Sequence, residues 1–260
     1  MTDAPAVGPK APTNPPIPDK PIWPKGLEPQ RLSQTVQWVN LMVYGDPGIG
    51  KTYFAGQACV YEETSPAVFV DVEGGTMSIR HLDPEHVIRV TDFKQLQQVY
   101  DVLFSGKHPY KTVVIDNLTE VQKLSMRTIM NQIVKEHPDR DVEVPSLREW
   151  GKSTEQVRRF VRAFRDLPMH VIFTAHSQEV KDETTGAVSI KPSLPGKLAD
   201  EIAGFIDIVC YMNVDKNGNR AMATRRVGRA VAKDRSGNLP EIVEEPTVEG
   251  VWPIIMGRKE

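Results

Sequence analysis

The sequence predicts an α/β domain in which a mainly parallel sheet is flanked by helices and carries an antiparallel hairpin near the C-terminus. Three observations support this fold class. Apolar segments of strand length alternate with segments of helix length along residues 36–214. A glycine-rich turn at 45–52 joins the first such strand to the first helix, and Asn217-Gly218, a type I′ turn signal, separates two late apolar segments. Near-continuous apolar strands separated by helices are typical of parallel sheets covered on both faces.

The individual elements follow from local patterns. Short apolar runs predict strands at 39–44, 67–72, 87–90, 111–116, 169–175, 206–214 and 221–227. Longer stretches predict helices at 52–61, 93–104, 119–136, 147–166 and 197–203. The helix at 147–166 has the clearest pattern, because apolar residues recur at helical spacing at Val157, Phe160, Val161, Phe164 and Leu167. The acidic stretch 137–145 and the polar stretch 176–196 are predicted to be loops.

Residues 1–30 are predicted to form a proline-rich disordered tail, and residues 31–260 a single domain. The tail holds nine of the chain's 21 prolines and almost no periodic apolar pattern, so it has too little apolar surface to offset the entropy of ordering. Ile22 and Trp23 are its only bulky apolar residues that stand together. They either dock on the domain or on a partner, or stay exposed.

The composition excludes several classes of protein. A formal net charge of -2 and a pI of about 6.3 are not those of a dedicated duplex-DNA binder, so any nucleic-acid contact must be local. Cys59 and Cys210 lack metal-ligand spacing and fit small buried hydrophobes in a reducing compartment. The sequence has neither an apolar run of about 18 residues nor a signal peptide at its start. We therefore expect a soluble protein of the cytoplasm.

The octapeptide Gly45-Asp-Pro-Gly-Ile-Gly-Lys-Thr52 fits the phosphate-binding pattern G-x-x-x-x-G-K-[ST]. Between a strand and a helix, its backbone N–H groups cradle phosphates, Lys51 reaches the terminal phosphates and the Thr52 hydroxyl holds Mg²⁺. The sequence therefore predicts binding of ATP with Mg²⁺. The residues expected to contact the nucleotide here are Gly45, Asp46, Pro47, Gly48, Ile49, Gly50, Lys51, Thr52 and Tyr53.

Asp116 ends the apolar strand Thr-Val-Val-Ile-Asp, as in the second signature of P-loop NTPases. In sheets of this type, ligands bind at the carboxyl ends of the strands. Asp116 is therefore predicted to stand beside Mg²⁺ and the Thr52 hydroxyl. The alternative is that Asp116 only caps the helix that starts near residue 119.

Hydrolysis also needs a group that orients or deprotonates the attacking water. In AAA+ and ABC ATPases this is usually a Glu directly after the second-signature Asp, and here that position is Asn117. Glu73 lies just past another strand end, 22 residues after Lys51, and is predicted to be the catalytic carboxylate. Asp71 and Glu73 are two residues apart on an extended segment and are expected to point the same way. The alternative is that both only solvate the strand end.

Three more side chains complete the predicted catalytic set of Lys51 and Glu73. His176 follows the strand at 169–175, where it would bond the γ-phosphate and report its presence to the next loop; the alternative is a structural histidine. A basic stretch after the hairpin would supply cations to a neighbouring subunit's ATP or to DNA, unless it is only a solvated strand face. Lys233 and Arg235 are the preferred pair in this stretch, which contains Arg220, Arg225, Arg226, Arg229, Lys233 and Arg235.

Taken together, these motifs resemble those of phage-encoded nucleotide-binding proteins with a stand-alone RecA-like core, some of which are considered single-strand annealing recombinases. The resemblance covers roughly residues 36–240. It rests on the P-loop octapeptide, Asp71-Val-Glu73-Gly-Gly, Val-Val-Ile-Asp116-Asn, Phe173-Thr-Ala-His176, Leu194-Pro-Gly-Lys-Leu-Ala-Asp-Glu-Ile and Ala232-Lys-Asp-Arg235.

The resemblance implies a RecA-like fold, ATP hydrolysis and a ring or filament with ATP at subunit junctions. It also implies action on single-stranded DNA in recombination or replication, with a single-strand-binding protein or another replication protein as a partner. Arg80, seven residues after Glu73, aligns with the position that stacks on adenine in RecA-type proteins. The stretches 137–148 and 177–196 align with DNA-holding loops, although the first is acidic, which disfavours phosphate contact.

Two other functions remain open. A nucleotide-gated loader or adaptor that acts on a protein partner is favoured by the weak charge of the candidate DNA loops. A P-loop small-molecule kinase would need an Arg-rich lid and an acceptor pocket, and both Glu73 and the late hairpin argue against it. Salt-dependent binding of single strands tests the first alternative, and ATP turnover without any acceptor tests the second.

Overall fold

The structure, a computed structural model, describes residues 23–31, 37–215 and 217–258. Contacts divide the chain into two units, residues 1–37 and 38–260. Most of the predicted tail, Ile22 included, lies outside the described residues, and Trp23 is exposed. Within 23–31 the chain makes a turn in which the Leu27 N–H donates to the Pro24 carbonyl oxygen at 3.0 Å. The boundary between tail and domain stays a prediction.

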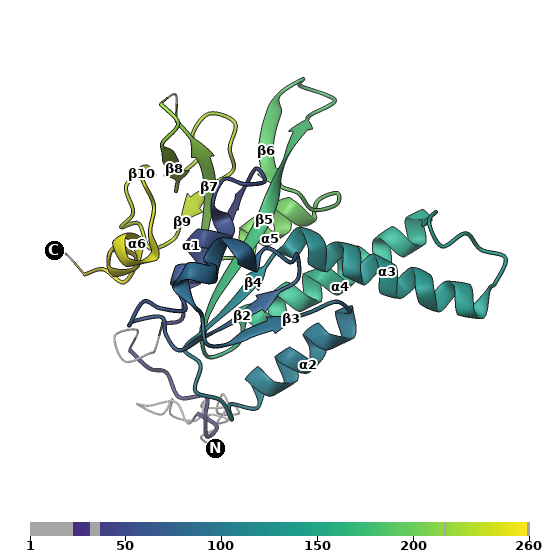
Figure 1. The fold of residues 1–260 in the computed structure, drawn as a ribbon, viewed down its shortest axis with the longest axis horizontal. Coiled ribbons are helices and arrows are strands. Elements are labelled where there is room, and N and C mark those ends of the chain that lie inside the picture. The colour runs from purple at the N-terminus through teal and green to yellow at the C-terminus, as the bar shows by residue number, and fades with distance from the viewer. Residues whose placement is uncertain (1–22, 32–36, 216, 259–260) are drawn as a thin grey trace, which may run out of the picture. The chain divides into compact units, whose positions relative to one another are not determined.

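A ten-stranded sheet forms the centre of the second unit (Figure 1). Its strands are β1 (Asn40–Gly45), β2 (Ala67–Asp71), β3 (Val87–Arg89), β4 (Thr112–Asp116), β5 (His170–Lys181), β6 (Val188–Pro192), β7 (Ile208–Val214), β8 (Arg220–Ala223), β9 (Lys233–Asp234) and β10 (Ile242–Glu244). The helices are α1 (Lys51–Gln57), the 3-10 helix η2 (Thr76–Leu82), α2 (Phe93–Phe104), α3 (Leu118–Glu136), α4 (Leu147–Arg165), α5 (Leu198–Phe205) and α6 (Val248–Ile255).

The strand order confirms the predicted fold class. The sheet runs β10-β8-β7-β1-β5-β4-β2-β3, with β6 paired to β5 and β9 to β7 off this path. The six strands from β7 to β3 pair in parallel. The other four pair antiparallel, and β7 and β8 form the predicted late hairpin around Asn217-Gly218.

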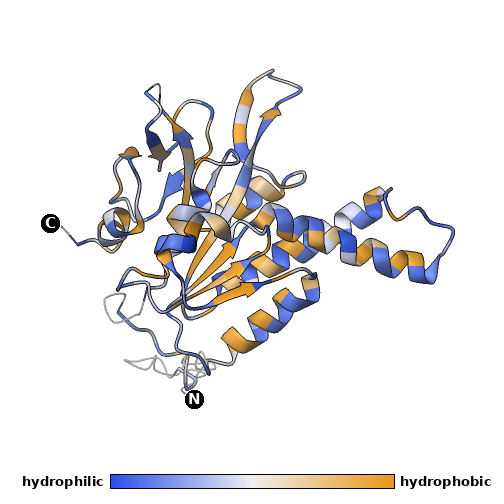
Figure 2. Ribbon diagram, in the orientation of Figure 1, coloured by the Kyte–Doolittle hydropathy of each residue, from blue (hydrophilic) through white to orange (hydrophobic). Residues whose placement is uncertain are grey.

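Helices cover both faces of the sheet, and two apolar cores result. Successive side chains of a strand point to opposite faces, so β1 sends Met42 and Tyr44 into one core and Leu41 and Val43 into the other. The first core packs under α2, α3, α4 and α5 and the second under α1 and α6. Figure 2 shows the central strands as the most apolar part of the ribbon. The carboxyl ends of the parallel strands are thereby held at one edge.

The helices α3 and α4 form an antiparallel arm that extends from the sheet (Figure 1). Each begins at a side-chain cap that satisfies free backbone N–H groups. Ser146 and Glu149 form a capping box at the start of α4, and the Asn117 side chain accepts from the Glu120 N–H at the start of α3. Because Asn117 directly follows β4, this cap fixes the arm to the strand that carries Asp116.

The structure corrects three local predictions. β5 continues to Lys181 and pairs with β6 where a polar loop was predicted, because backbone pairing rather than an apolar run forms this hairpin. α6 was not predicted, since Pro253 lies inside it and interrupts the helical signal. The strand predicted at 221–227 is shorter, since β8 ends at Ala223. β3 is an exposed edge strand.

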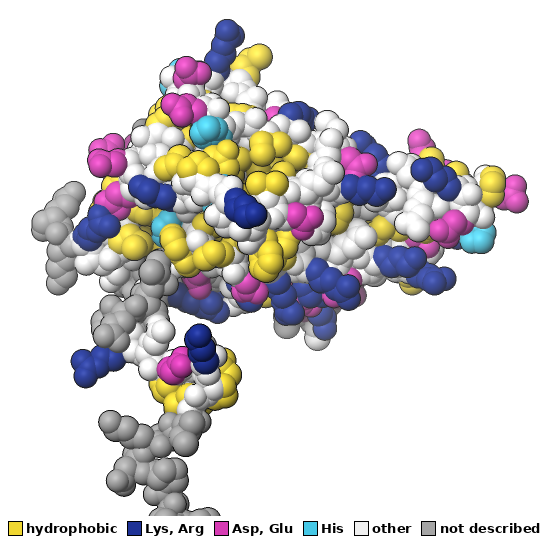
Figure 3. Space-filling view, turned by 90° about the horizontal axis from the view of Figure 1, so that it is seen from below, with side chains coloured by type: hydrophobic (Ala, Val, Ile, Leu, Met, Phe, Trp, Pro, Cys, Tyr) yellow, Lys and Arg dark blue, Asp and Glu magenta, His cyan; other side chains and the backbone are white. Residues whose placement is uncertain are grey.

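An apolar surface remains exposed beside this edge. Val87 and Ile88 of β3 and Val102 and Phe104 of α2 are all more than a third exposed, and apolar side chains gather on the face shown in Figure 3. Patches of this kind often mark protein contacts. None of the helices in the described ranges is long and apolar enough to cross a membrane.

His170, at the start of β5, is buried between two aromatic rings. Its Nδ1 accepts from the Val39 N–H at 3.0 Å, and Trp38 and Trp252 pack edge-on against it. Burial lowers the pKa of His170 from 6.5 to about 4, and the Lys111 ammonium adds to the shift. The neutral ring is therefore the form that fits the fold.

This histidine predicts a loss of stability in mild acid. The unfolded chain binds a proton near pH 6.5 and the folded chain only near pH 4, so stability falls as pH falls through that window, by about 2 kcal/mol between pH 8 and pH 5. Urea unfolding at both pH values measures the loss. His170→Gln should remove this part of the pH dependence, whereas His137→Gln, at an exposed position, should retain it. An equal loss in wild type and His170→Gln would contradict the prediction.

Candidate nucleotide-binding site

The turn between β1 and α1 requires both glycines that the P-loop pattern specifies, Gly45 and Gly50. A Cβ on Gly45 would overlap the carbonyl oxygen of Met212 in β7. Gly50 has a φ of 106°, in the region that side chains disfavour. The close approach of β1 to β7 and the sharp entry into α1 therefore both depend on these residues.

Lys51 is buried within the turn that it follows. Its ammonium donates to the carbonyl oxygens of Gly45 at 3.0 Å and Asp46 at 2.7 Å. Burial lowers the pKa of Lys51, while the carboxylates of Glu73, Asp116 and Asp46 raise it in part. The ammonium thus lies inside the loop and among the acidic groups of the site.

Asp116 is fully buried at the end of β4, and two hydroxyls bind its carboxylate. Thr52 Oγ1 donates to Oδ2 at 2.9 Å, and Thr174 Oγ1 donates to Oδ1. Burial raises the pKa of Asp116; the Thr174 and Thr52 hydrogen bonds offset part of the rise, and the Glu73 and Asp71 carboxylates add to it. A buried carboxylate of this kind is stabilised by a nearby cation.

The residues around Asp116 fit a magnesium ion. Gly75 leaves the space beside them open, because a Cβ there would come within 3.6 Å of Thr52 Oγ1 and 3.8 Å of Asp116 Oδ2. A hydroxyl and a carboxylate are hard oxygen ligands, the type that Mg²⁺ prefers. Thr52 and Asp116 are accordingly the residues that would hold the metal, directly or through water.

Glu73 and Asn117, which follow the ends of β2 and β4, form a polar cluster with His176, which lies within β5 just before its pairing with β6. Asn117 Nδ2 donates to Glu73 Oε2. His176 Nε2 lies 3.1 Å from Glu73 Oε1 and 3.4 Å from Asn117 Nδ2. The Glu73 carboxylate is thus held on both oxygens while its side chain stays about one-third exposed.

The position of β5 explains why these side chains meet. β5 lies between β1, which leads into the P-loop, and β4, which ends in Asp116. Gly45 pairs in register with His176, and Asp71 at the end of β2 pairs with Asp116. Parallel strands therefore bring the P-loop, the buried carboxylate and the cluster to one edge of the sheet.

Asp71 does not join Glu73, contrary to the expectation that the two point the same way. Its carboxylate pairs with the Arg89 guanidinium at 2.9 Å and accepts from the Gly74 N–H at 2.6 Å. The backbone bends after Val72, because both Val72 and Glu73 donate N–H groups to the Asp116 carbonyl oxygen. Asp71 shapes this bend, and Glu73 alone reaches the cluster.

The remaining predicted residues lie apart from the cluster. Arg80 is exposed on η2, next to His81, which stacks on Tyr53 with ring centres 5.4 Å apart. Lys233 and Arg235 both donate to the Gly204 carbonyl oxygen, beside the amino end of β7. They therefore lie at the amino ends of the parallel strands, whereas the P-loop of the same chain lies at the carboxyl ends.

Thr174 was not predicted to be a hydrogen-bond donor to Asp116. The signal was present, because Thr174 is a polar residue inside an apolar strand and lies two positions before His176, on the same face. The Thr119 hydroxyl was missed as well; it accepts from the His176 N–H at 3.1 Å and fixes the end of β5. No local pattern marks that contact, since it joins α3 to β5.

The glycine turn, the buried lysine and the Thr52–Asp116 contact define a P-loop domain, the class that binds nucleotides through this turn. Residues 38–236 match the family described as AAA domain. Because the match spans more than half of the chain, the chain belongs to this family. The crystal structure of the RadB recombinase is similar, at 18% identity and a TM-score of 0.43, over 79% of this chain and 86% of that chain. No curated protein matches the chain.

Removal of the Thr174 hydroxyl should expose the dependence of Asp116 on its donors. Thr174→Val keeps the shape but leaves Asp116 Oδ1 without this donor, which should cost roughly 1–3 kcal/mol of unfolding free energy. Thr112→Val is the matched control, because Thr112 is also a buried strand threonine but its Oγ1 has no partner among the described residues. Urea unfolding compares the two. Equal losses would show that the hydroxyl of Thr174 does not support Asp116.

Proposed function

We propose that this protein is an ATP-binding and ATP-hydrolysing RecA-like protein that acts on single-stranded DNA in annealing, recombination or replication. In this proposal the protein is encoded by a phage and works in the cytoplasm of the host cell. The proposal of ATP hydrolysis rests on the cluster of Glu73, Asn117 and His176. This cluster lies at the carboxyl ends of the parallel strands, beside Lys51 and Asp116. A partly exposed carboxylate beside a phosphate loop has the place required of a group that acts on water.

Each residue has a separate task in this proposal. The P-loop N–H groups and Lys51 bind the phosphates, and Thr52 and Asp116 hold Mg²⁺, which neutralises charge on the phosphates when bound. Glu73 accepts a hydrogen bond from the attacking water and orients it. Asn117 and His176 bind the two oxygens of Glu73 and so fix the direction in which the carboxylate points.

The β5–β6 hairpin is the proposed route from the nucleotide to DNA. It begins directly after His176, and the Ser177 hydroxyl donates to the Asp46 carboxylate in the P-loop. A phosphate bound in the loop would compete for these groups, so the hairpin would respond to the nucleotide. DNA binding itself is supported by the resemblance of the motifs to annealing recombinases.

The position of Lys233 and Arg235 supports the proposed assembly into a ring or filament. Both lie beside the amino end of β7, whereas the P-loop follows the carboxyl end of the parallel strand β1. These cations therefore reach a phosphate only on a neighbouring copy. In the same proposal, Arg80 lies beside the adenine on η2, next to the P-loop helix.

A nucleotide-gated loader or adaptor is the second candidate. The exposed apolar surface of β3 and α2 favours it, because such a surface fits a protein partner. Both functions use the same nucleotide site and differ in what the nucleotide controls.

Glu73→Gln tests the hydrolytic role. It keeps the size of the side chain but removes the charge that accepts a proton, so ATP turnover should fall about 100-fold, within the range of general-base catalysis. ATP affinity should change little. Glu62→Gln, on an exposed side chain near α1, serves as the control and should turn over ATP like wild type. Full turnover by Glu73→Gln would remove Glu73 from catalysis.

Binding of a fluorescent single-stranded oligonucleotide separates the two candidate functions. With an ATP analogue at low salt, the recombinase proposal expects binding that weakens steeply as salt rises. Electron microscopy of the same mixtures should show rings or filaments. Absence of binding at low salt with the ATP analogue present would reject the DNA role and leave the loader or adaptor.

A further inference from the structure

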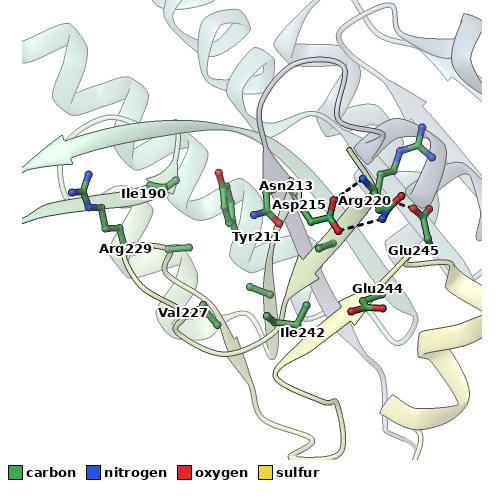
Figure 4. A pocket seen from close by; sticks show the side chains of 14 residues that line it. Ile190, Tyr211, Asn213, Asp215, Arg220, Val227, Arg229, Ile242, Glu244 and Glu245 are labelled. Atoms are coloured by element: carbon green, nitrogen blue, oxygen red, sulfur yellow. Dashed lines mark hydrogen bonds between the residues drawn. The ribbon is translucent and has the colours of Figure 1, made fainter. Parts of the chain in front are cut away.

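Arg220, the first residue of β8, places its guanidinium against the P-loop of its own chain. Its Nε lies 2.9 Å from the position that a Cβ on Gly50 would occupy, and its Cζ is 5.8 Å from the centre of the Tyr53 ring. Figure 4 shows the side chain turned away from the cavity bordered by Tyr211 and Ile242. The late hairpin thus carries a cation to the turn at the start of α1.

Both backbone groups of Arg220 are fixed by one residue, Glu245. The Arg220 N–H donates to Glu245 Oε1 at 3.1 Å, and the Glu245 N–H donates to the Arg220 carbonyl oxygen at 2.8 Å. Glu245 has a φ of 43°, a conformation that costs a residue with a side chain about 1–2 kcal/mol. The reciprocal hydrogen bonds keep Glu245 in this conformation, and they fix the position of the Arg220 backbone.

The guanidinium of Arg220 has no carboxylate partner among the described residues. Two other late arginines are engaged, since Arg235 pairs with Asp207 at 3.0 Å and Arg225 donates to the Leu239 carbonyl oxygen. A second cation beside Lys51 raises the electrostatic energy of the loop unless an anion lies between them. The Arg220 guanidinium is therefore a cation beside the P-loop whose charge an anionic ligand would neutralise.

We propose that Arg220 binds the phosphates of the nucleotide from within the same subunit, which rests on the nucleotide binding proposed above. It borders Gly50 and Tyr53 and does not pair with Glu73, so it lies outside the hydrolytic cluster. Its charge acts on the diphosphate portion that ATP and ADP share. Arg220 thus contributes to nucleotide affinity, and Glu245 positions Arg220. Lys233 and Arg235, by contrast, would reach the phosphates of a neighbouring subunit's nucleotide.

Titration calorimetry with ADP and with a non-hydrolysable ATP analogue tests this assignment. Loss of a charge-assisted contact should raise the Kd of both nucleotides in Arg220→Gln by about 10- to 100-fold. Arg127→Gln, an exposed arginine on α3, is the control for a general change in charge. Equal Kd values in the two variants would overturn the proposal, as would a loss confined to turnover. If wild type binds neither nucleotide, the proposed function fails instead.

Variants of Glu245 separate positioning from structural support. Glu245→Gly relieves the positive φ but removes the carboxylate, so it should leave unfolding stability equal or higher while weakening both nucleotides several-fold. Glu245→Gln keeps an oxygen acceptor and should restore wild-type affinity. A Glu245→Gly variant that binds both nucleotides like wild type would show that the Glu245 carboxylate is not needed to position Arg220.

Discussion

The site depends on the burial of the Asp116 carboxylate. A buried charge needs hydrogen-bond partners, and Asp116 draws them from α1 through Thr52 and from β5 through Thr174. Its backbone carbonyl accepts from both Val72 and Glu73 and so bends the chain after β2. One residue thereby ties the P-loop helix, the central strand and the segment that carries Glu73 to the same point.

Asn117 explains how the site differs from the AAA+ pattern in which a Glu follows the aspartate. Its Oδ1 accepts from the Glu120 N–H and caps α3, and its Nδ2 donates to Glu73. A neutral amide both accepts and donates, whereas an ionised carboxylate only accepts, so neither Asp nor Glu in ionised form would perform the two tasks. Glu73, the carboxylate proposed for catalysis, instead follows β2, and the helix cap and the orientation of Glu73 are linked in one side chain.

The ends of β2 and β4 were predictable because each is encoded locally. A parallel α/β sheet requires Asp116, Glu73 and His176 to share an edge once their strands are recognised, and the structure brings them together. The separate courses of Asp71 and Glu73 were not predictable, since the bend comes from a hydrogen bond to β4. Arg220 and α6 likewise depend on contacts between segments that are far apart in the sequence.

Two contacts link the β5–β6 hairpin to the P-loop and its strand, Tyr44 with Ile190 and Ser177 with Asp46. The Tyr44 hydroxyl, one residue before the loop, donates to the carbonyl oxygens of Ile190 and Val231, and Ser177 donates to Asp46. The Ser193 N–H donates to the His176 carbonyl oxygen at 2.7 Å, which closes the base of the hairpin. Any shift of the loop upon phosphate binding is therefore opposed or followed by the hairpin.

The acidic 137–145 segment has no such connection within the described residues. It joins α3 to α4 at the far end of the arm (Figure 1), and its side chains make local contacts, such as Arg140 with Glu149 at 3.2 Å. Nucleotide-dependent control requires a physical path from the phosphate site to the ligand surface. Of the two segments considered for DNA, the β5–β6 hairpin has that path, and the proposal for nucleotide-controlled DNA binding rests on it.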